Sequence, residues 1–340
     1  MSENGAELRF DGRVAVVTGA GSGLGRAHAE LLASRGARVV VSELPASEQR
    51  ALEVCAGIAA QGGQAVPVLG RVGDAAHAEE LVVAALDHFG RIDIVVNNAG
   101  TPGTVGMTAE YAPTETLEAQ YDVHLRGPMQ INRAAWPHFV DQRYGRILLT
   151  SSPNGTGWMP GAAGYEIDYA TAKGAIFALA RQTAGAGIAH GIKVNALMPW
   201  AYTTMVRTNY GTSEMGRWME ANLRADLAVA GVLPLLHEDC PTTGETISSA
   251  GGRVARVFFA ATRGYFGPKL TPETVMANWS QVMGTVGETG ELQDAFEQTF
   301  VREREVLYRT LNEGAVPDLP WIVHQVLKPS SAEDTSARIP

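Results

Sequence analysis

Short runs of β-branched residues alternate with longer helical stretches from residue 14 onward, and this alternation constrains the fold most strongly. The runs predict strands over residues 14–17, 39–41, 65–69, 92–96, 146–150, 193–197 and 245–248. The stretches between them predict helices over 24–34, 47–61, 75–89, 116–142 and 169–186. Such βαβ units form a parallel sheet that is covered by helices on both faces. The sequence therefore predicts an α/β protein with a parallel sheet of about seven strands.

The composition supports a buried core and argues against several kinds of partner. Of 340 residues, 45% are apolar and 19% are charged, which excludes a disordered chain. The net charge of −9 would repel a phosphate backbone, so we expect no nucleic-acid partner. The N-terminus has no apolar signal segment and no run of about 18 apolar residues occurs, which predicts a cytoplasmic protein without membrane association. Cys55 and Cys240 are too few for a disulfide framework or a thiolate zinc site.

Several catalytic motifs do not occur in the sequence. None of the four lysines follows a glycine, which excludes a Walker-A phosphate loop. Neither G-x-S-x-G nor H-E-x-x-H is present. Kinase-like, esterase and metalloprotease functions therefore lose their main support.

A glycine-rich turn from Thr18 to Gly25 joins the first predicted strand to the first predicted helix. Backbone amides at the N-terminus of a helix bind a pyrophosphate when no side chain obstructs them. The residues predicted on this basis to bind a cofactor are Gly19, Ser22, Gly23, Leu24 and Gly25. The alternative is a tight turn without a ligand, since Leu24 stands where the G-x-G-x-x-G fingerprint requires glycine.

An acidic residue at the end of the second predicted strand indicates which dinucleotide would bind. Glu43 stands where a carboxylate in a dinucleotide-binding fold accepts hydrogen bonds from the adenosine ribose. That carboxylate would repel the 2′-phosphate of NADP, and no Arg or Lys immediately follows it. The predicted cofactor is therefore NAD, with a solvated glutamate as the alternative interpretation.

Tyr169 and Lys173 form a Y-x-x-x-K pair at the start of a predicted helix. The i,i+4 spacing places both side chains on one helix face. An ammonium group near a phenol lowers the pKa of the phenol, so Tyr169 is a candidate general base for an alcohol proton. The alternative is an amphipathic helix with its tyrosine in the core.

These motifs, in this order, resemble those of the short-chain dehydrogenase/reductase superfamily. The match comprises the turn Thr18–Gly25, the N-N-A-G sequence at Asn97–Gly100, Ser151-Ser152 after a strand, and the Tyr169/Lys173 pair. It covers about residues 10–250 and implies a Rossmann-like, doubly wound sheet. Within the superfamily, V-H-L-R-G at 123–127 resembles the dehydrogenase part of multifunctional enzyme type 2, also called 17β-hydroxysteroid dehydrogenase type 4.

The resemblance implies hydride transfer between a secondary alcohol and a nicotinamide, without a metal. Tyr169 would take the hydroxyl proton, Ser152 would bind the substrate oxygen, and Lys173 would bind the nicotinamide ribose. His124 completes the predicted catalytic residues and stands where the superfamily usually has Asn. The other residues implied as cofactor-binding are Val72, Asn98, Ala99, Gly100, Pro199 and Thr204, in addition to Tyr169 and Lys173.

The sequence departs from the superfamily pattern at further positions. Arg71 stands where an aspartate usually faces the adenine, and Trp200 replaces the glycine expected after Pro199. The gap between Ser152 and Tyr169 is about four residues longer than usual, so Tyr165 stands at the habitual distance from the serine. Tyr165 has no lysine four residues later, and we therefore assign the base to Tyr169.

Residues 200–236 interrupt the βα rhythm and are rich in Met and aromatic side chains, including Trp200, Met215 and Trp218. This excursion is interpreted either as a lid over a bulky apolar substrate or as a local core. The sequence favours a hydroxysteroid slightly, with a (3R)-3-hydroxyacyl-CoA as the alternative substrate. A nicotinamide-binding sensor without catalytic activity is the second alternative.

The remaining expectations concern domains and assembly. A dehydrogenase domain is expected over 10–250, a C-terminal helical and loop extension over 251–328 that packs on the same domain, and a disordered tail over 329–340. The resemblance implies a homodimer or homotetramer that pairs the helices 116–142 and 169–186. Ile131 and Trp136 are candidate interface residues, although core packing would explain them equally well.

Overall fold

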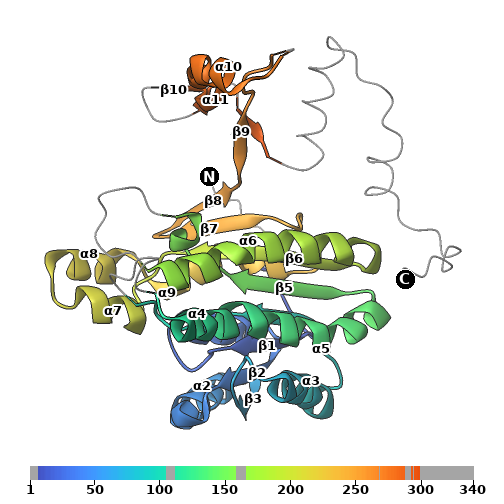
Figure 1. The fold of residues 1–340 in the computed structure, drawn as a ribbon. Coiled ribbons are helices and arrows are strands. Elements are labelled where there is room, and N and C mark those ends of the chain that lie inside the picture. The colour runs from blue at the N-terminus through green and yellow to red at the C-terminus, as the bar shows by residue number, and fades with distance from the viewer. Residues whose placement is uncertain are drawn as a thin grey trace, which may run out of the picture. The chain divides into compact units, whose positions relative to one another are not determined.

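In the computed structural model, eight strands form one sheet in the order β3-β2-β1-β4-β5-β6-β7-β8 (Figure 1). All neighbouring pairs from β3 to β7 are parallel. The bounds are β1 Val14–Thr18, β2 Arg38–Glu43, β3 Gln64–Leu69, β4 Ile94–Asn97, β5 Gly145–Thr150, β6 Ile192–Pro199, β7 Thr246–Ala250 and β8 Arg253–Val257. The predicted α/β class and doubly wound sheet are confirmed, with β8 as one strand more than the seven predicted.

The structure describes residues 7–104, 112–157, 166–267, 269–287, 292–293 and 295–298. The chain divides after residue 256 into two units, each of which is described by itself. The predicted tail at 329–340 lies outside the described residues, and the packing of 251–328 onto the first domain stays a prediction.

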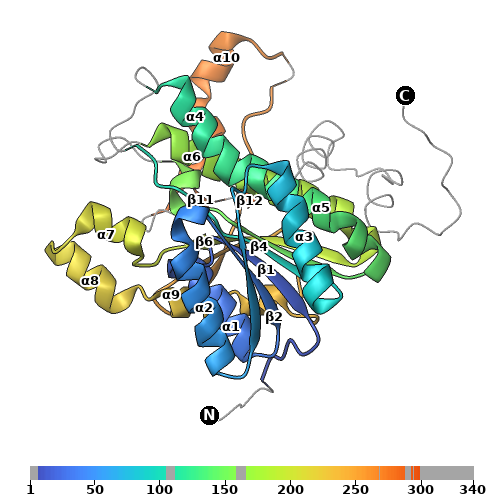
Figure 2. The ribbon, with the colours of Figure 1, turned by 90° about the horizontal axis from the view of Figure 1, so that it is seen from below.

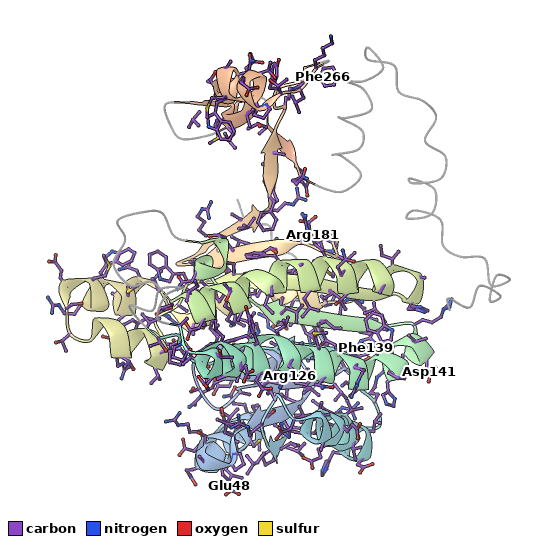
Figure 3. All side chains as sticks on the ribbon, in the orientation of Figure 1. Glu48, Arg126, Phe139, Asp141, Arg181 and Phe266 are labelled. Carbon is purple, nitrogen blue, oxygen red and sulfur yellow. The ribbon has the colours of Figure 1, made fainter. Side chains whose placement is uncertain are left out.

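Both faces of the sheet from β1 to β6 carry a core, because successive side chains of these strands enter two different clusters. In β1, Ala15 and Val17 belong to one core cluster, and Val14 and Val16 belong to the other. The first core is covered by α1 (Gly23–Ser34) and α2 (Glu48–Ala60), and the second by α3 (Ala75–Phe89), α5 (Gly127–Gln142) and α6 (Ile167–Gly187) (Figure 2). Phe139 of α5 is fully buried in the second core, whereas Asp141 of the same helix is exposed (Figure 3).

The long helix predicted over 116–142 is interrupted. The structure has α4 (Thr114–Tyr121), a π-helical turn at Asp122–Arg126, and then α5. In a regular α-helix the amide of residue 128 would donate a hydrogen bond to the carbonyl of His124. Pro128 has no amide hydrogen, so this bond cannot form. A single π-turn inside a helix is common at functional sites. Ile131 is buried in the second core and Trp136 packs against it, so core packing accounts for both residues.

The excursion after β6 consists of a first part, residues 200–222, and a second part, residues 223–236, which differ in burial. The helices are α7 (Thr204–Tyr210), α8 (Glu214–Asn222) and α9 (Ala225–Ala230), followed by a 3-10 turn at Leu233–Leu236. The second part is core, because α9 packs on α1 and the leucines at 233, 235 and 236 are buried. In the first part, Trp200, Met215 and Trp218 are about half exposed. A local core therefore explains only the second part of the excursion.

The second unit contains short elements. Within its described residues, the helices are α10 (Pro272–Ala277) and α11 (Trp279–Met283). Strand β9 (Ala260–Thr262) pairs with β12 (Ala295–Glu297), and β10 (Thr285–Val286) pairs with β11 (Leu292–Gln293), both antiparallel. None of the helices in the described ranges of either unit has the length and hydropathy needed to cross a bilayer.

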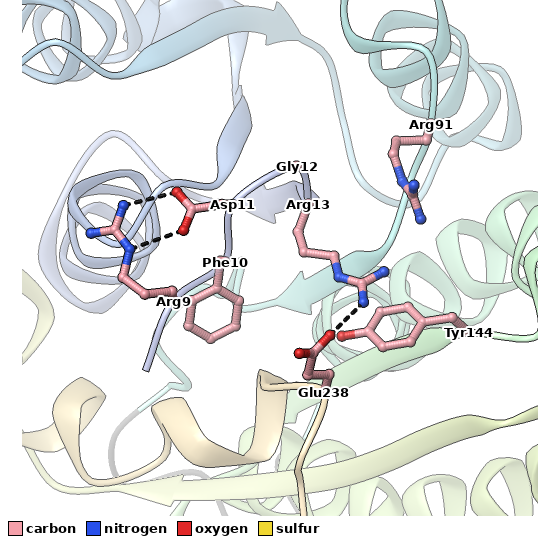
Figure 4. A pocket seen from close by; sticks show the side chains of 8 residues that line it. All are labelled: Arg9, Phe10, Asp11, Gly12, Arg13, Arg91, Tyr144 and Glu238. Atoms are coloured by element: carbon pink, nitrogen blue, oxygen red, sulfur yellow. Dashed lines mark hydrogen bonds and ion pairs between the residues drawn. The ribbon is translucent and has the colours of Figure 1, made fainter. Parts of the chain in front are cut away.

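Charged side chains connect the amino ends of three strands, at the edge opposite to the predicted site. Asp93 is fully buried before β4 and accepts hydrogen bonds from Arg91, Arg13 and the Val14 amide. Arg13 also donates to Glu238, 2.8 Å away, and its guanidinium lies 3.8 Å from the centre of the Tyr144 ring (Figure 4). Arg13, Arg91, Tyr144 and Glu238 line a pocket here, and the hydrogen bonds of Asp93 fasten the amino ends of β1 and β4 together.

Asp93→Ala is expected to lower the free energy of unfolding by about 3–5 kcal/mol, because it leaves two arginines without their buried counter-charge. Urea denaturation measures the loss. The control is Asp226→Ala, which removes an exposed partner of Arg224 and should cost less than about 1 kcal/mol. Equal losses in the two variants would contradict the importance of the buried carboxylate.

Candidate active site

The glycine-rich turn leaves the N-terminus of α1 open. Gly19 has a φ of +61°, and a Cβ atom at position 25 would lie 2.1 Å from the Gly19 carbonyl oxygen. The first backbone bond of the helix runs from Arg26 to Ser22, so the amides before Arg26 have no acceptor inside the helix. The Ser22 side chain does not cap the helix, and Leu24 is half-buried. Unobstructed amides of this kind suit a pyrophosphate.

Glu43 lies directly beside this turn. Its Oε2 accepts a hydrogen bond from the Gly21 amide at 3.0 Å, and its Oε1 accepts one from the Leu44 amide at 2.9 Å. A Cβ atom at Gly21 would also lie 3.0 Å from Cβ of Arg50, so an arginine stem borders the same turn. The predicted proximity of Glu43 to the glycine turn is therefore present, and Arg50 is a neighbouring cation that the sequence did not suggest.

The segment after β4 is fastened to the end of β1. Thr18 Oγ1 accepts hydrogen bonds from the amides of Asn98 and Ala99, each at 3.0 Å. The Asn98 side chain donates to the Thr18 carbonyl at 2.9 Å. Gly100 continues this segment toward His124, because a Cβ atom at position 100 would lie 2.7 Å from Cε1 of that ring. The structure thus brings Asn98 and Ala99 to the glycine turn and Gly100 to His124, and their predicted contact with a cofactor stays a prediction.

The loop after β3 packs against the π-helical turn. Val72 is buried, and a Cβ atom at Gly73 would lie 2.2 Å from Oδ2 of Asp122. The Asp122 carboxylate pairs with Arg126 at 2.6 Å and with Arg71 at 4.0 Å. Arg71, which stands where the superfamily has an acid, is thus accompanied by an acid from a distant part of the chain.

Ser152, Tyr169 and Lys173 converge after β5 and on the first turns of α6. Lys173 Nζ donates to the Thr150 carbonyl at 2.7 Å and lies 5.6 Å from the centre of the Tyr169 ring. Tyr169 forms a hydrogen bond with the Ser152 side chain. Ser152 Oγ in addition accepts the Asn154 amide at 3.2 Å. The proposed triad is therefore assembled in the structure.

Burial dominates the ionisation of the triad. Loss of solvation raises the pKa of Tyr169 to about 12, with an opposing effect from Ser152 and a further increase from the Glu166 carboxylate. Loss of solvation also lowers the pKa of Lys173 to about 7. The sequence predicted a lowered pKa for Tyr169, and this prediction is wrong for the protein without a ligand. Burial raises the pKa of the phenol, and Lys173 cannot offset this because about half of its ammonium groups are neutral near pH 7.

His124 is buried against Tyr169. The two ring centres are 5.2 Å apart with an interplanar angle of 84°, and Nε2 lies 3.1 Å from the Thr101 carbonyl oxygen. Burial, followed by the positive charge of Lys173, lowers the pKa of His124 well below its ordinary value. Nδ1 is buried and has no hydrogen-bond partner among the described residues. The imidazole is therefore neutral and retains one free polar atom beside the triad.

The residues after β6 approach the glycine turn from the other side. Pro199 ends β6, and the half-exposed ring of Trp200 lies 6.3 Å from that of Trp218. The side chain nearest to the turn is Thr203, whose Cγ2 would lie 3.3 Å from a Cβ atom at Gly23. Thr204, the predicted residue, begins α7. The sequence missed Thr203 because spacing alone does not decide which of two adjacent threonines faces the turn.

Sequence reasoning also missed the polar neighbours of Tyr169. Asp168 is fully buried and accepts the Tyr169 amide on Oδ1 at 2.7 Å, while Oδ2 has no partner among the described residues. Glu166 accepts the Asn154 side chain at 3.0 Å. Two acids within three residues of a predicted base were the available signal. Tyr165, the rival candidate base, lies outside the described residues.

The site fits a nicotinamide dinucleotide. The glycine turn forms a cradle that a Cβ atom at position 25 would fill, and Glu43 presents carboxylate oxygens beside it. Residues of the turn and of the 98–100 segment would hold the phosphates and the nicotinamide half, and Lys173 would hold its ribose. When bound, the dinucleotide supplies the hydride acceptor.

The cofactor-free protein should become more stable as the pH rises from 7 to 9. The pKa of Lys173 is about 7 in the fold, against 10.5 in the unfolded chain, so the unfolded chain holds the extra proton in this range. The free energy of unfolding should rise by up to about 1.4 kcal/mol per pH unit from this group. Urea denaturation of wild type and Lys173→Met at pH 7, 8 and 9 measures the difference, and identical slopes would refute a depressed pKa.

Known proteins resemble the chain over most of its length. A family model described as short chain dehydrogenase matches residues 13–214. Peroxisomal multifunctional enzyme type 2 from Mus musculus is 35% identical over 327 residues, which cover 92% of this chain and 42% of that protein. A 3-oxoacyl-[acyl-carrier-protein] reductase from Synechocystis sp. is 32% identical, covering 71% of this chain and 97% of that protein.

A solved structure, full-length peroxisomal multifunctional enzyme type 2 from Drosophila melanogaster, matches with a TM-score of 0.72 at 29% identity. The match covers 90% of this chain and 50% of that protein. The chain therefore spans half or less of the length of these two multifunctional relatives.

Proposed function

Because the chain belongs to the short-chain dehydrogenase/reductase family, we propose that it is an NAD-dependent dehydrogenase of (3R)-3-hydroxyacyl thioesters. The observation that carries the proposal is the convergence of Ser152, Tyr169 and Lys173 at the carboxyl ends of the strands, beside an open glycine turn. The family itself establishes an oxidoreductase that acts on a small molecule.

Each side chain of the triad has a distinct task in the proposed reaction. Ser152 and Tyr169 hold the substrate hydroxyl, and Tyr169 accepts its proton. Lys173 is anchored on Thr150 and titrates near pH 7, so it is suited to pass that proton onward. The neutral His124 ring packs edge-on against Tyr169, and its Nδ1, which has no partner among the described residues, would accept a hydrogen bond from a water when Nε2 carries the proton and donates to the Thr101 carbonyl.

The names of the relatives favour an acyl thioester over the hydroxysteroid that the sequence analysis put first. The Synechocystis relative is named for a 3-oxoacyl group on a carrier protein, which is the oxidised form of a 3-hydroxyacyl thioester. The exposed Trp200 and Trp218 suit an apolar acyl chain as well as a fused ring system.

A side-by-side assay of the chain with a (3R)-3-hydroxyacyl-CoA and with a 17β-hydroxysteroid, under NAD and NADP, tests the substrate class. Nicotinamide reduction should occur with the thioester. Turnover of the steroid alone would reverse the choice, and binding of NAD without any turnover would favour the non-catalytic sensor.

The predicted cytoplasmic location and the predicted dimer or tetramer stay predictions.

Tyr169→Phe is expected to lower kcat/KM by about 10²–10⁴-fold, the usual contribution of a general base. The dissociation constant for NAD should stay within about threefold, because only a hydroxyl is removed. Tyr121→Phe is the matched control. The Tyr121 hydroxyl of α4 forms a hydrogen bond with Thr171, which lies on the exposed surface of α6, the helix that carries Tyr169. Loss of turnover in Tyr165→Phe with activity retained in Tyr169→Phe would overturn the assignment.

Glu43 supports the choice of NAD, because its carboxylate beside the glycine turn would repel a 2′-phosphate. Glu43→Ala should raise the ratio of kcat/KM for NADP to that for NAD by about tenfold or more, which corresponds to about 1.4 kcal/mol. Arg50 would then be the nearby cation for the added phosphate. Glu48→Ala, an exposed acid in the first turn of α2, is the control and should leave the ratio unchanged.

A further inference from the structure

The Glu166 carboxylate lies near Ser152 and Tyr169, the two residues proposed to hold the substrate oxygen. Glu166 precedes Tyr169 by one helical turn, and a Cβ atom at Gly103 would lie 2.6 Å from Cβ of Tyr169 and 3.0 Å from Cβ of Glu166. Asn154 connects the carboxylate to the serine, because its side chain donates to Glu166 Oε2 at 3.0 Å and its amide donates to Ser152 Oγ at 3.2 Å. Glu166 therefore lies at the reacting end of the site.

The Glu166 charge has no compensating cation among the residues that the structure describes. No ion pair within the described ranges involves Glu166. The fully buried carboxylate of Asp168 lies two residues away and adds charge of the same sign. Burial raises the pKa of Glu166, and the Asn154 hydrogen bond opposes that rise. The Glu166 carboxylate does not assist proton transfer, because its charge raises the pKa of Tyr169. We therefore looked for an effect of this charge on substrate binding.

We infer that Glu166 is a specificity-determining residue that rejects free 3-hydroxy acids and admits the same acyl group only when its acid is masked as a thioester. The inference rests on the proposed function. In a 3-hydroxy acid, only one carbon separates the carbinol from the carboxylate. When Tyr169 and Ser152 hold the hydroxyl, the substrate anion is one carbon away from the carbinol, and the Glu166 carboxylate, which Asn154 links to Ser152, repels it across a partly buried site. A thioester carries no charge at that carbon.

The test compares (3R)-3-hydroxybutyrate with its N-acetylcysteamine thioester, a pair that shares the acyl group and lacks the phosphates of CoA. Glu166→Gln keeps an acceptor for Asn154 and removes the charge. This variant should raise kcat/KM for the free acid by about tenfold or more, chiefly through a lower KM, which corresponds to about 1.4 kcal/mol. The value for the thioester should change less than about threefold. Glu118→Gln on the exposed face of α4 makes the same charge change and should alter neither value.

A second measurement needs no variant. For the wild-type protein loaded with NAD, neutral butyramide should compete with the thioester at least about tenfold more tightly than butyrate does. The inference fails if butyrate competes as well as butyramide, or if Glu166→Gln leaves the ratio of acid to thioester turnover unchanged while the thioester is oxidised. In those cases the proposed function stands. If the wild type oxidises a steroid and not the thioester, the proposed function fails and the inference fails with it.

Discussion

The Thr18 hydroxyl joins the carboxyl ends of β1 and β4, and the arrangement of the whole site depends on this connection. By accepting two consecutive amides, it directs the chain after β4 across the glycine turn and onward to Gly100 and His124. The same turn holds Glu43 through the Gly21 amide. Because parallel strands end at one edge of the sheet, residues far apart in sequence meet there. A single hydroxyl thus brings together the region proposed to hold the dinucleotide and the region that contains the triad.

Ser152 and Lys173 are buried and Tyr169 is half-buried before any ligand arrives, and this burial has a cost. Lys173 and Tyr169 both lose solvation, which favours their neutral forms. Their geometry nevertheless stays fixed, because Lys173 is bound to the Thr150 carbonyl and Tyr169 packs on His124. The protein therefore provides position first. The charge distribution that activates a phenol must be completed when the site is loaded, in keeping with the general rule that preorganised polar groups act most strongly where water is excluded.

The sequence predicted those features that local patterns determine. The seven strands of the parallel region, the glycine turn and the family were confirmed, since periodicity, short motifs and their order carry that information. The break of the helix at Asp122–Arg126 was missed, because apolar spacing continues through it and Pro128, the available signal, was given no weight. The nearness of Glu166 to Tyr169 and Ser152 was likewise missed, because it depends on how the segment after β5 folds back on α6. The direction of the Tyr169 pKa shift was wrong, since spacing does not report burial.

The close approach of Gly73 to Asp122 has a consequence for redesign of cofactor choice. No reactive group lies in the loop after β3, so its residues are natural targets for libraries that vary nucleotide preference. Any side chain at position 73 would displace the Asp122 carboxylate, which pairs with Arg126 and Arg71 and belongs to the π-turn that also carries His124. Selection for a new nucleotide at this loop would therefore disturb the ion pairs of the π-turn, so position 73 is best left as glycine in such a library.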